Sequence, residues 1–198
     1  MSKIILDLGC GKNKYKEDAI GVDILPLLNV DVVADLRNKY LPFKDNIADI
    51  VIASHIIEHL NSDDRINFFY EVYRILKPNG QFILRFPHSA AWRTKTDIQH
   101  KDIGNLTIKT FKNLDFENGE HAHYFNFKFK FLEGHFYELI IFIPMRNVRI
   151  SNKHPIWIIS NYLIDKPIKF LCNKFESLVY FIKPYQANVE VILKGIKS

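Results

Sequence analysis

Three short, mostly apolar runs in the first 35 residues each end in a glycine turn or a carboxylate. Residues 4–8 lead into Gly9 and Gly11, residues 19–23 end in Asp23, and residues 30–35 end in Asp35. Apolar runs this short, bounded by turn residues, are typical of buried strands rather than helices. Because the carboxyl ends of parallel strands meet at one edge of a sheet, this pattern predicts an α/β fold with a ligand site at that edge.

The alternation of strand and helix signals continues to residue 86. Residues 48–54 and 81–86 read as a fourth and a fifth strand. A helix is expected to begin near Asn61 and to end at the Pro78-Asn79-Gly80 turn, because capping and acidic residues open it and turn residues close it. Its apolar stripe consists of Ile66, Phe69, Tyr73 and Leu76.

The second half of the chain is less regular. Residues 87–124 show no sustained periodicity, and within them the long connection formed by residues 87–120 is a candidate lid over a substrate. Residues 125–136 alternate aromatic and polar side chains, which favours a strand and leaves a helix as the competing interpretation. Residues 139–142, 147–150 and 188–193 resemble strands. Helical spacing after Pro167 joins Ile168, Leu171, Phe175, Leu178 and Ile182.

Composition excludes several classes of protein. A chain of 198 residues with 47% hydrophobic and 25% charged residues fits one globular domain. Its halves would be residues 1–86, which hold a cofactor, and residues 87–198, which face the substrate. We expect no membrane span, since no stretch approaches the roughly 20 apolar residues required. Two cysteines cannot build a disulfide framework, so we expect a cytoplasmic protein. The net charge is −1 over residues 1–90 and +6 over residues 91–198, so the basic excess lies in the second half.

Each residue type at the first three strand ends has a plausible task. Gly9 and Gly11 let a ligand approach the backbone closely. Asp23 can accept two hydrogen bonds from a ribose diol, and Asp35 can accept one from an adenine amino group while Leu36 packs on the ring. A dinucleotide-binding motif is disfavoured, because Lys14 stands where its third glycine belongs.

Together these segments resemble class I S-adenosylmethionine-dependent methyltransferases of the type-11-like group. The resemblance implies a Rossmann-like seven-stranded sheet of order 3-2-1-4-5-7-6 with an antiparallel last strand, and S-adenosyl-L-methionine as cofactor. Residues 12–18 are too few for the usual first helix, so we expect a loop there. The matching motifs are Leu6-Asp7-Leu8-Gly9-Cys10-Gly11, Gly21-Val22-Asp23, Ala34-Asp35-Leu36, Leu41-Pro42-Phe43, Ala48-Asp49-Ile50-Val51, Glu58-His59-Leu60 and Leu76-Lys77-Pro78-Asn79-Gly80. The implied cofactor contacts are Asp7, Gly9, Cys10, Gly11, Asp23, Ile24, Asp35, Leu36, Ser54 and His55.

The segment from His55 to His59 also matches a His-x-x-Glu-His metalloprotease pattern. That interpretation is disfavoured because the segment follows a strand end instead of lying within a helix. Some relatives bind a metal through Glu-x-x-Glu-His at this place, but His55 replaces the first Glu; His121 and His123 could complete a softer site. We favour Glu58 and His59 holding the loop by hydrogen bonds, and we expect no metal.

Methyl transfer to a hydroxyl or a protonated amine requires a proton acceptor. His59 and His121 are the expected catalytic residues, chosen from a set that also includes His55, His88 and His123. The expected acceptor is a small molecule or a glycan. A non-catalytic module that binds an adenosyl nucleotide or RNA is the alternative, although no nucleic-acid motif is present. Residues 157–181 would cover the sheet or form a homodimer face, with peripheral membrane contact as the competing interpretation.

Overall fold

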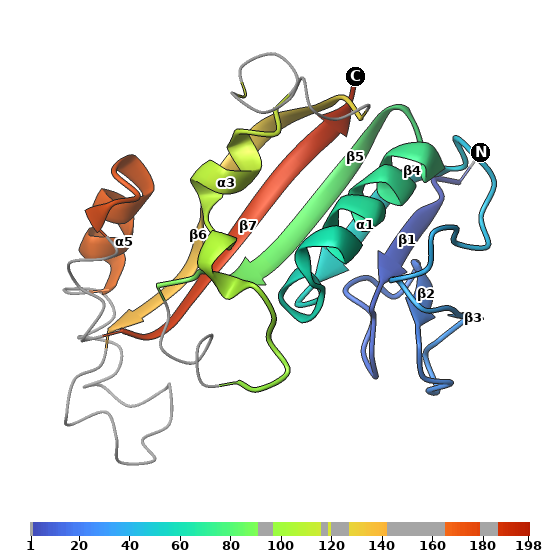
Figure 1. Cartoon of the computed structure of the whole chain (residues 1–198), viewed down its shortest axis with the longest axis horizontal. Coiled ribbons are helices and arrows are strands. Elements are labelled where there is room, and N and C mark those ends of the chain that lie inside the picture. The colour runs from blue at the N-terminus through green and yellow to red at the C-terminus, as the bar shows by residue number, and fades with distance from the viewer. Residues whose placement is uncertain (1, 91–96, 116–118, 120–126, 142–164, 179–185) are drawn as a thin grey trace.

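The computed structural model describes residues 2–90, 97–115, 119, 127–141, 165–178 and 186–198, and they form one seven-stranded sheet (Figure 1). The strand order is β3-β2-β1-β4-β5-β7-β6, as predicted. The strands are β1 (Ile5–Leu8), β2 (Ile20–Asp23), β3 (Val32–Val33), β4 (Ala48–Ser54), β5 (Leu76–Pro87), β6 (Phe129–Ile141) and β7 (Gln186–Lys197).

The first five strands are parallel, so their carboxyl ends share one edge of the sheet. Leu8 at the end of β1 pairs with Val22 of β2 and with Ala53 of β4. The last described strand, β7, is antiparallel to both β5 and β6, between which it lies. This arrangement confirms the predicted antiparallel last strand and places the glycine turn after β1 in the middle of the parallel part.

The main helix, α1 (Ser62–Ile75), begins where the sequence predicts. The Asn61 side chain accepts a hydrogen bond from the Asp64 N–H at 2.8 Å, which satisfies one free donor of the first turn. The helix buries Phe68, Phe69, Val72 and Ile75 against the sheet. Phe69 also contacts Phe111 of α3 (Ile108–Lys112), and Figure 1 shows α1 and α3 over the same face. The aromatic core therefore joins both halves of the chain.

Two boundaries differ from the predictions. The helix ends at Ile75, before the Pro78-Asn79-Gly80 turn, because Leu76 is already extended and proline disfavours helical backbone in the residue before it. These turn residues lie within the irregular start of β5, where the register with β4 shifts. The third strand is only two residues long.

The remaining helical elements are short. Residues 12–18 form turns and bends without a helix, which confirms the predicted loop. The region expected to be irregular contains η2 (Ile103–Asn105) and α3, and η1 (Ile57–His59) follows β4. The helix predicted after Pro167 is α5 (Lys166–Lys174), shorter than its sequence pattern. The predictions for residues 125–126, 142, 147–150 and Ile182 lie outside the described residues.

Candidate functional site

A pocket of about 270 Å³ lies at the carboxyl ends of the first strands. It brings together residues from turns that are far apart in the sequence, and five of the predicted cofactor contacts line it. Its lining consists of Gly9, Asp23, Ile24, Asp35, Leu36, Arg37, Ile56, His59 and Leu60. The strand-end pattern of the sequence therefore corresponds to one shared cavity.

The glycine turn after β1 has a backbone that other residues adopt only with strain. Gly9 has φ +74° and Gly11 has φ +57°, both in the left-handed region. A Cβ atom at Gly9 would lie 2.0 Å from Cδ1 of Ile56, so there is no room for a side chain at this position. The N–H groups of Gly9 and Cys10 both donate to the Val22 carbonyl, at 2.7 and 3.1 Å, which fixes the turn against β2.

Asp23 ties the end of β2 to this turn. Its Oδ2 accepts a hydrogen bond from the Gly11 N–H at 2.9 Å, and its Oδ1 accepts one from the Leu25 N–H at 3.0 Å. Each carboxylate oxygen has two lone pairs, so both can accept a second hydrogen bond from a ligand. Asp23 is thus held in place by the protein and still able to bind a diol.

Asp35 is held by a residue that the sequence analysis missed. Arg37 donates from Nε to Oδ1 at 2.9 Å and from Nη2 to Oδ2 at 2.5 Å. These hydrogen bonds lower the pKa of Asp35 below its ordinary value. Leu36, between them, is buried with its side chain in the pocket lining. No periodicity marks Arg37; its position two residues after a strand-end carboxylate is the only sequence signal.

Asp7 and Cys10, two of the predicted cofactor contacts, are not among the residues that line the pocket. Asp7 is 1% exposed, and its Oδ2 accepts a hydrogen bond from the Tyr15 N–H at 2.5 Å. Burial raises the pKa of the Asp7 carboxyl, although the Tyr15 hydrogen bond opposes this. Burial likewise raises the pKa of the Cys10 thiol. Asp7 therefore supports the loop that replaces the first helix.

The segment after β4 carries the remaining predicted residues. Ser54 ends the strand, and His55 has φ +57° with its N–H donating to the Arg85 carbonyl at 3.0 Å. Nδ1 of His55 lies 3.2 Å from Oε1 of Glu58, and Nδ1 of His59 lies 3.4 Å from the Gln99 carbonyl. His59 lines the pocket. His121 and His123 lie outside the described residues.

A loop from the second half of the chain meets this segment. The Lys101 N–H donates to the Glu58 carbonyl at 2.7 Å. Arg65, which is buried, donates to the carbonyls of Ile57 and Asp102 at 2.8 and 2.9 Å. These bonds bring His100 to His59, with ring centroids 5.0 Å apart. The sequence analysis missed His100, because no local pattern marks a contact that depends on one buried arginine.

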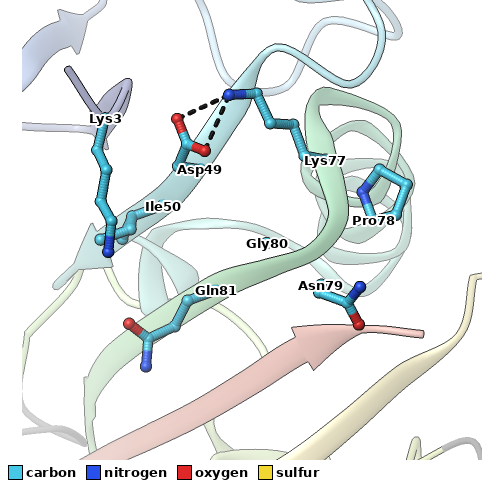
Figure 2. Close-up of a pocket in the computed structure, with 8 residues that line it drawn as sticks. All are labelled: Lys3, Asp49, Ile50, Lys77, Pro78, Asn79, Gly80 and Gln81. Carbon is cyan, nitrogen blue, oxygen red and sulfur yellow. Dashed lines mark hydrogen bonds and ion pairs between the residues drawn. The ribbon is translucent and has the colours of Figure 1, made fainter. Parts of the chain in front are cut away.

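A second pocket, of about 280 Å³, lies near the amino-terminal end of β4 and the start of β5 (Figure 2). Lys77 Nζ lies 2.8 Å from each oxygen of Asp49, and Asp49 Oδ2 also accepts a hydrogen bond from the Ile4 N–H at 2.8 Å. Figure 2 shows Lys77 joined to both oxygens of Asp49 by this ion pair. The carboxylate here joins structural elements and is paired with a lysine.

The first half of the chain is similar to known methyltransferases. Residues 6–84 match the family model described as a methyltransferase domain. A probable S-adenosylmethionine-dependent methyltransferase of Mycolicibacterium smegmatis is 30% identical over 100 residues, which cover 42% of this chain and 38% of that protein. An uncharacterized methyltransferase-like protein of Schizosaccharomyces pombe is 27% identical over 112 residues, which cover 48% and 40%. The matched region thus spans about two fifths of the length of these curated relatives.

Among solved structures, a SAM-dependent methyltransferase from Archaeoglobus fulgidus superposes with a TM-score of 0.61. It is 18% identical and the match covers 98% of this chain and 86% of that one, which shows a shared fold. The match of residues 6–84 to the methyltransferase family model and the strand order 3-2-1-4-5-7-6 thus agree, and the chain has the fold of this methyltransferase. The predicted fold class is therefore confirmed, and the match over residues 6–84 supports the predicted family and its cofactor. Within the described residues, no helix is both long and apolar enough to cross a membrane.

Proposed function

We propose that this chain transfers the methyl group of S-adenosyl-L-methionine to a hydroxyl or amine of a small-molecule or glycan acceptor. The observation that carries the proposal is the shared cavity of Gly9, Asp23 and Asp35. The backbone of the glycine turn at Gly9 allows the ligand a close approach, and the Asp23 carboxylate suits the ribose diol. The Asp35 carboxylate, beside the apolar side chain of Leu36, suits the adenine ring.

In this proposal the cofactor lies across the strand ends. The ribose hydroxyls donate to Asp23, beside the exposed side chain of Ile24, and the adenine amino group donates to Asp35 while Leu36 packs on the ring. The methionine end of the cofactor then follows the glycine turn after β1 toward Cys10, Gly11 and Asp7. Ser54 and His55, at the end of β4, complete the predicted contacts.

Methyl transfer is an in-line displacement, so most of the acceleration comes from holding the nucleophile against the methyl carbon. The bond from the acceptor oxygen or nitrogen to carbon forms as the carbon–sulfur bond breaks, and the acceptor loses a proton. We place His59 at the acceptor side, because it lines the pocket and borders the loop from the second half. His121 remains the second proposed catalytic residue.

We further propose that residues 1–198 act as one domain, with residues 87–198 covering the acceptor. A soluble cytoplasmic protein, a homodimer and a peripheral membrane contact through residues 157–181 also remain proposals. Co-sedimentation with anionic vesicles tests the last of these: a chain that stays in the supernatant does not bind that surface.

Calorimetry with S-adenosylmethionine, ATP and single-stranded RNA tests the proposed function against the non-catalytic alternative. We expect S-adenosylmethionine and its demethylated product to bind, and ATP and RNA not to bind. Binding of RNA alone would support the non-catalytic module. A screen of hydroxyl and amine acceptors, read as formation of S-adenosylhomocysteine, then identifies the substrate class.

A further inference from the structure

Helix α5 and the residue that follows it expose three large apolar side chains. Phe170, Leu171 and Phe175 are 69%, 47% and 51% exposed. The inner face of the same helix is packed, because Cys172 is buried and Ile168 lies against the main hydrophobic core. Large apolar side chains grouped on the outside of a docked helix indicate a surface that binds a partner.

Lysines alternate with these apolar side chains. Residues four positions apart lie one above the other on a helix, so Lys166, Phe170 and Lys174 form one line along the outside of α5. The ammonium group of Lys174 lies 5.5 Å from the centre of the Phe175 ring. Positions 166–175 contain three lysines and no acidic residue. The outer face of α5 is therefore both apolar and positively charged.

The charge of this face favours one kind of partner. A symmetric dimer brings the same patch of both copies together, so it would place lysines against lysines, and like charges in contact weaken an interface. The surface of an anionic membrane suits both properties of the face. Phenylalanine and leucine enter the boundary between headgroups and acyl chains, while lysines extend their apolar stems and keep their ammonium groups among the negative headgroups.

The segment after α5 is fixed to the carboxyl edge of the sheet. Oε1 of Glu176 accepts a hydrogen bond from the Ile108 N–H at 2.6 Å, and Oε2 accepts one from the Lys109 N–H at 3.0 Å. Oε1 also lies 3.0 Å from Nε2 of His88, a fully buried residue directly after β5. The outer face of α5 is therefore held in a defined position relative to the strand ends.

The cofactor pocket lies at the same edge of the sheet. Arg85, near the end of β5, pairs with Ser54, the last residue of β4, and His59 in the turn after β4 lines the pocket. A membrane bound by α5 would bring lipid headgroups to this edge. We infer that the outer face of α5 binds the surface of an anionic membrane and that the methyl acceptor is carried by a lipid of that membrane.

This substrate class rests on the proposed function and narrows it. The acceptor is a hydroxyl or an amine on the headgroup of a lipid, and its oxygen or nitrogen forms the bond to the methyl carbon as the carbon–sulfur bond of the cofactor breaks. The proton of the acceptor passes to the imidazole of His59, as in the proposed function. Binding of the whole chain to the membrane holds enzyme and acceptor together, which raises the effective concentration of the acceptor.

The first experiment measures flotation of the full chain with vesicles of phosphatidylcholine and phosphatidylglycerol, and with vesicles of phosphatidylcholine alone. We expect binding to the anionic vesicles, weaker binding to the neutral ones, and a loss of affinity at high salt. Phe170→Ser combined with Phe175→Ser should weaken binding by about ten-fold or more, and Lys174→Glu by about ten-fold.

Leu28→Ser is the matched control. Leu28 is 99% exposed on the loop after β2, and Figure 1 shows α5 beside β6, at the opposite edge of the sheet from β3. This variant should bind vesicles like the parent chain. No binding by the parent, or equal binding by the parent and the double variant, overturns the membrane surface. A dimer in solution that the double substitution dissociates, measured by light scattering, also overturns it, because a second copy then covers the face.

The second experiment tests the acceptor. S-adenosylmethionine labelled in its methyl group is incubated with the chain and with lipid or water-soluble extracts of cells that produce the chain naturally. Label in the organic phase supports a lipid-borne acceptor, and absence of label from that phase overturns it. Binding of S-adenosylhomocysteine is measured in the same samples. A chain that binds it but not the vesicles keeps the proposed function and loses this inference, whereas a chain that binds only the vesicles loses the proposed function.

Discussion

The two ends of the parallel sheet carry pockets of almost equal volume, about 270 Å³ at the carboxyl ends and about 280 Å³ at the amino end. Both contain a carboxylate whose backbone partner comes from another segment: Asp23 accepts from the Gly11 N–H and Asp49 from the Ile4 N–H. The difference lies in what surrounds each carboxylate. Asp49 is neutralised by Lys77, whereas Asp23 stands beside a left-handed glycine turn and an exposed apolar side chain.

This comparison teaches that pocket size alone does not identify a ligand site. Strand direction supports the proposed site at the carboxyl ends, because ligands of open α/β sheets bind outside the carboxyl ends of the strands. In the amino-end pocket, the ion pair between Asp49 and Lys77 joins β4 to β5 (Figure 2). Paired substitutions, one in each pocket, can separate effects on cofactor binding from effects on the stability of the fold.

The largest effect is expected from Gly9→Ala. The new Cβ would be strained at φ +74° and would lie 2.0 Å from Ile56 Cδ1, so S-adenosylhomocysteine binding should weaken by about 2–4 kcal/mol. Calorimetry measures this loss. Gly80→Ala, at the other pocket, would place its Cβ 2.8 Å from the Lys77 carbonyl oxygen and should lower the melting temperature while leaving affinity unchanged. A Gly80→Ala chain that also loses affinity would contradict the separation of the two ends.

Asp23→Ala should have the next largest effect. Loss of charged hydrogen bonds to the ribose should weaken cofactor binding by about 1–3 kcal/mol, or roughly 5- to 150-fold. Asp49→Ala is the matched control: it removes the partner of Lys77 and should change thermal stability with no effect on affinity. Equal affinities in the parent and Asp23→Ala chains would show that the ribose does not bind there.

The smallest expected effect concerns stability at low pH. Glu176 is largely buried, which by itself would raise its pKa, but hydrogen bonds from His88 and from the Ile108 N–H lower the pKa below its ordinary value. Glu176 therefore stabilises the fold above about pH 4.5, and this contribution is lost as the pH falls toward its folded-state pKa. Glu176→Gln should cost about 1–2 kcal/mol at pH 7 and progressively less below pH 4.5. Thermal melts from pH 3 to 7 measure the difference, and a constant difference would contradict the assignment.

Much of the cofactor half follows from local sequence. Residues 48–54 form β4 as predicted, because an apolar run with short flanking turns leaves little choice. The third strand is shorter than predicted: it comprises Val32 and Val33, and next to it the Gly21 N–H donates to the side chain of Asp31, which also pairs with Lys14. Side-chain contacts of this kind depend on residues ten or more positions apart and have no local signature.

The residues of the candidate site likewise fall into those that the local sequence predicts and those that it does not. Asp23 and Asp35 were predictable because a strand end fixes where their side chains lie. His100 was not, because its position depends on Arg65, 35 residues earlier in the chain, donating to backbone carbonyls on either side. The predicted role of His121 concerns a residue outside the described part, and it stays a prediction.

The position of β7 between β5 and β6 has a consequence for biosynthesis. β6 ends at Ile141 and β7 begins at Gln186, so β6 leaves the ribosome well before the strand with which it pairs. At a synthesis rate of about 5–20 residues per second, the edges of β5 and β6 that pair with β7 stay unpaired for several seconds. Unpaired edges of this kind are where chains associate wrongly. Slower translation between residues 142 and 185 should therefore lower the yield of this protein by lengthening the time that these edges are exposed.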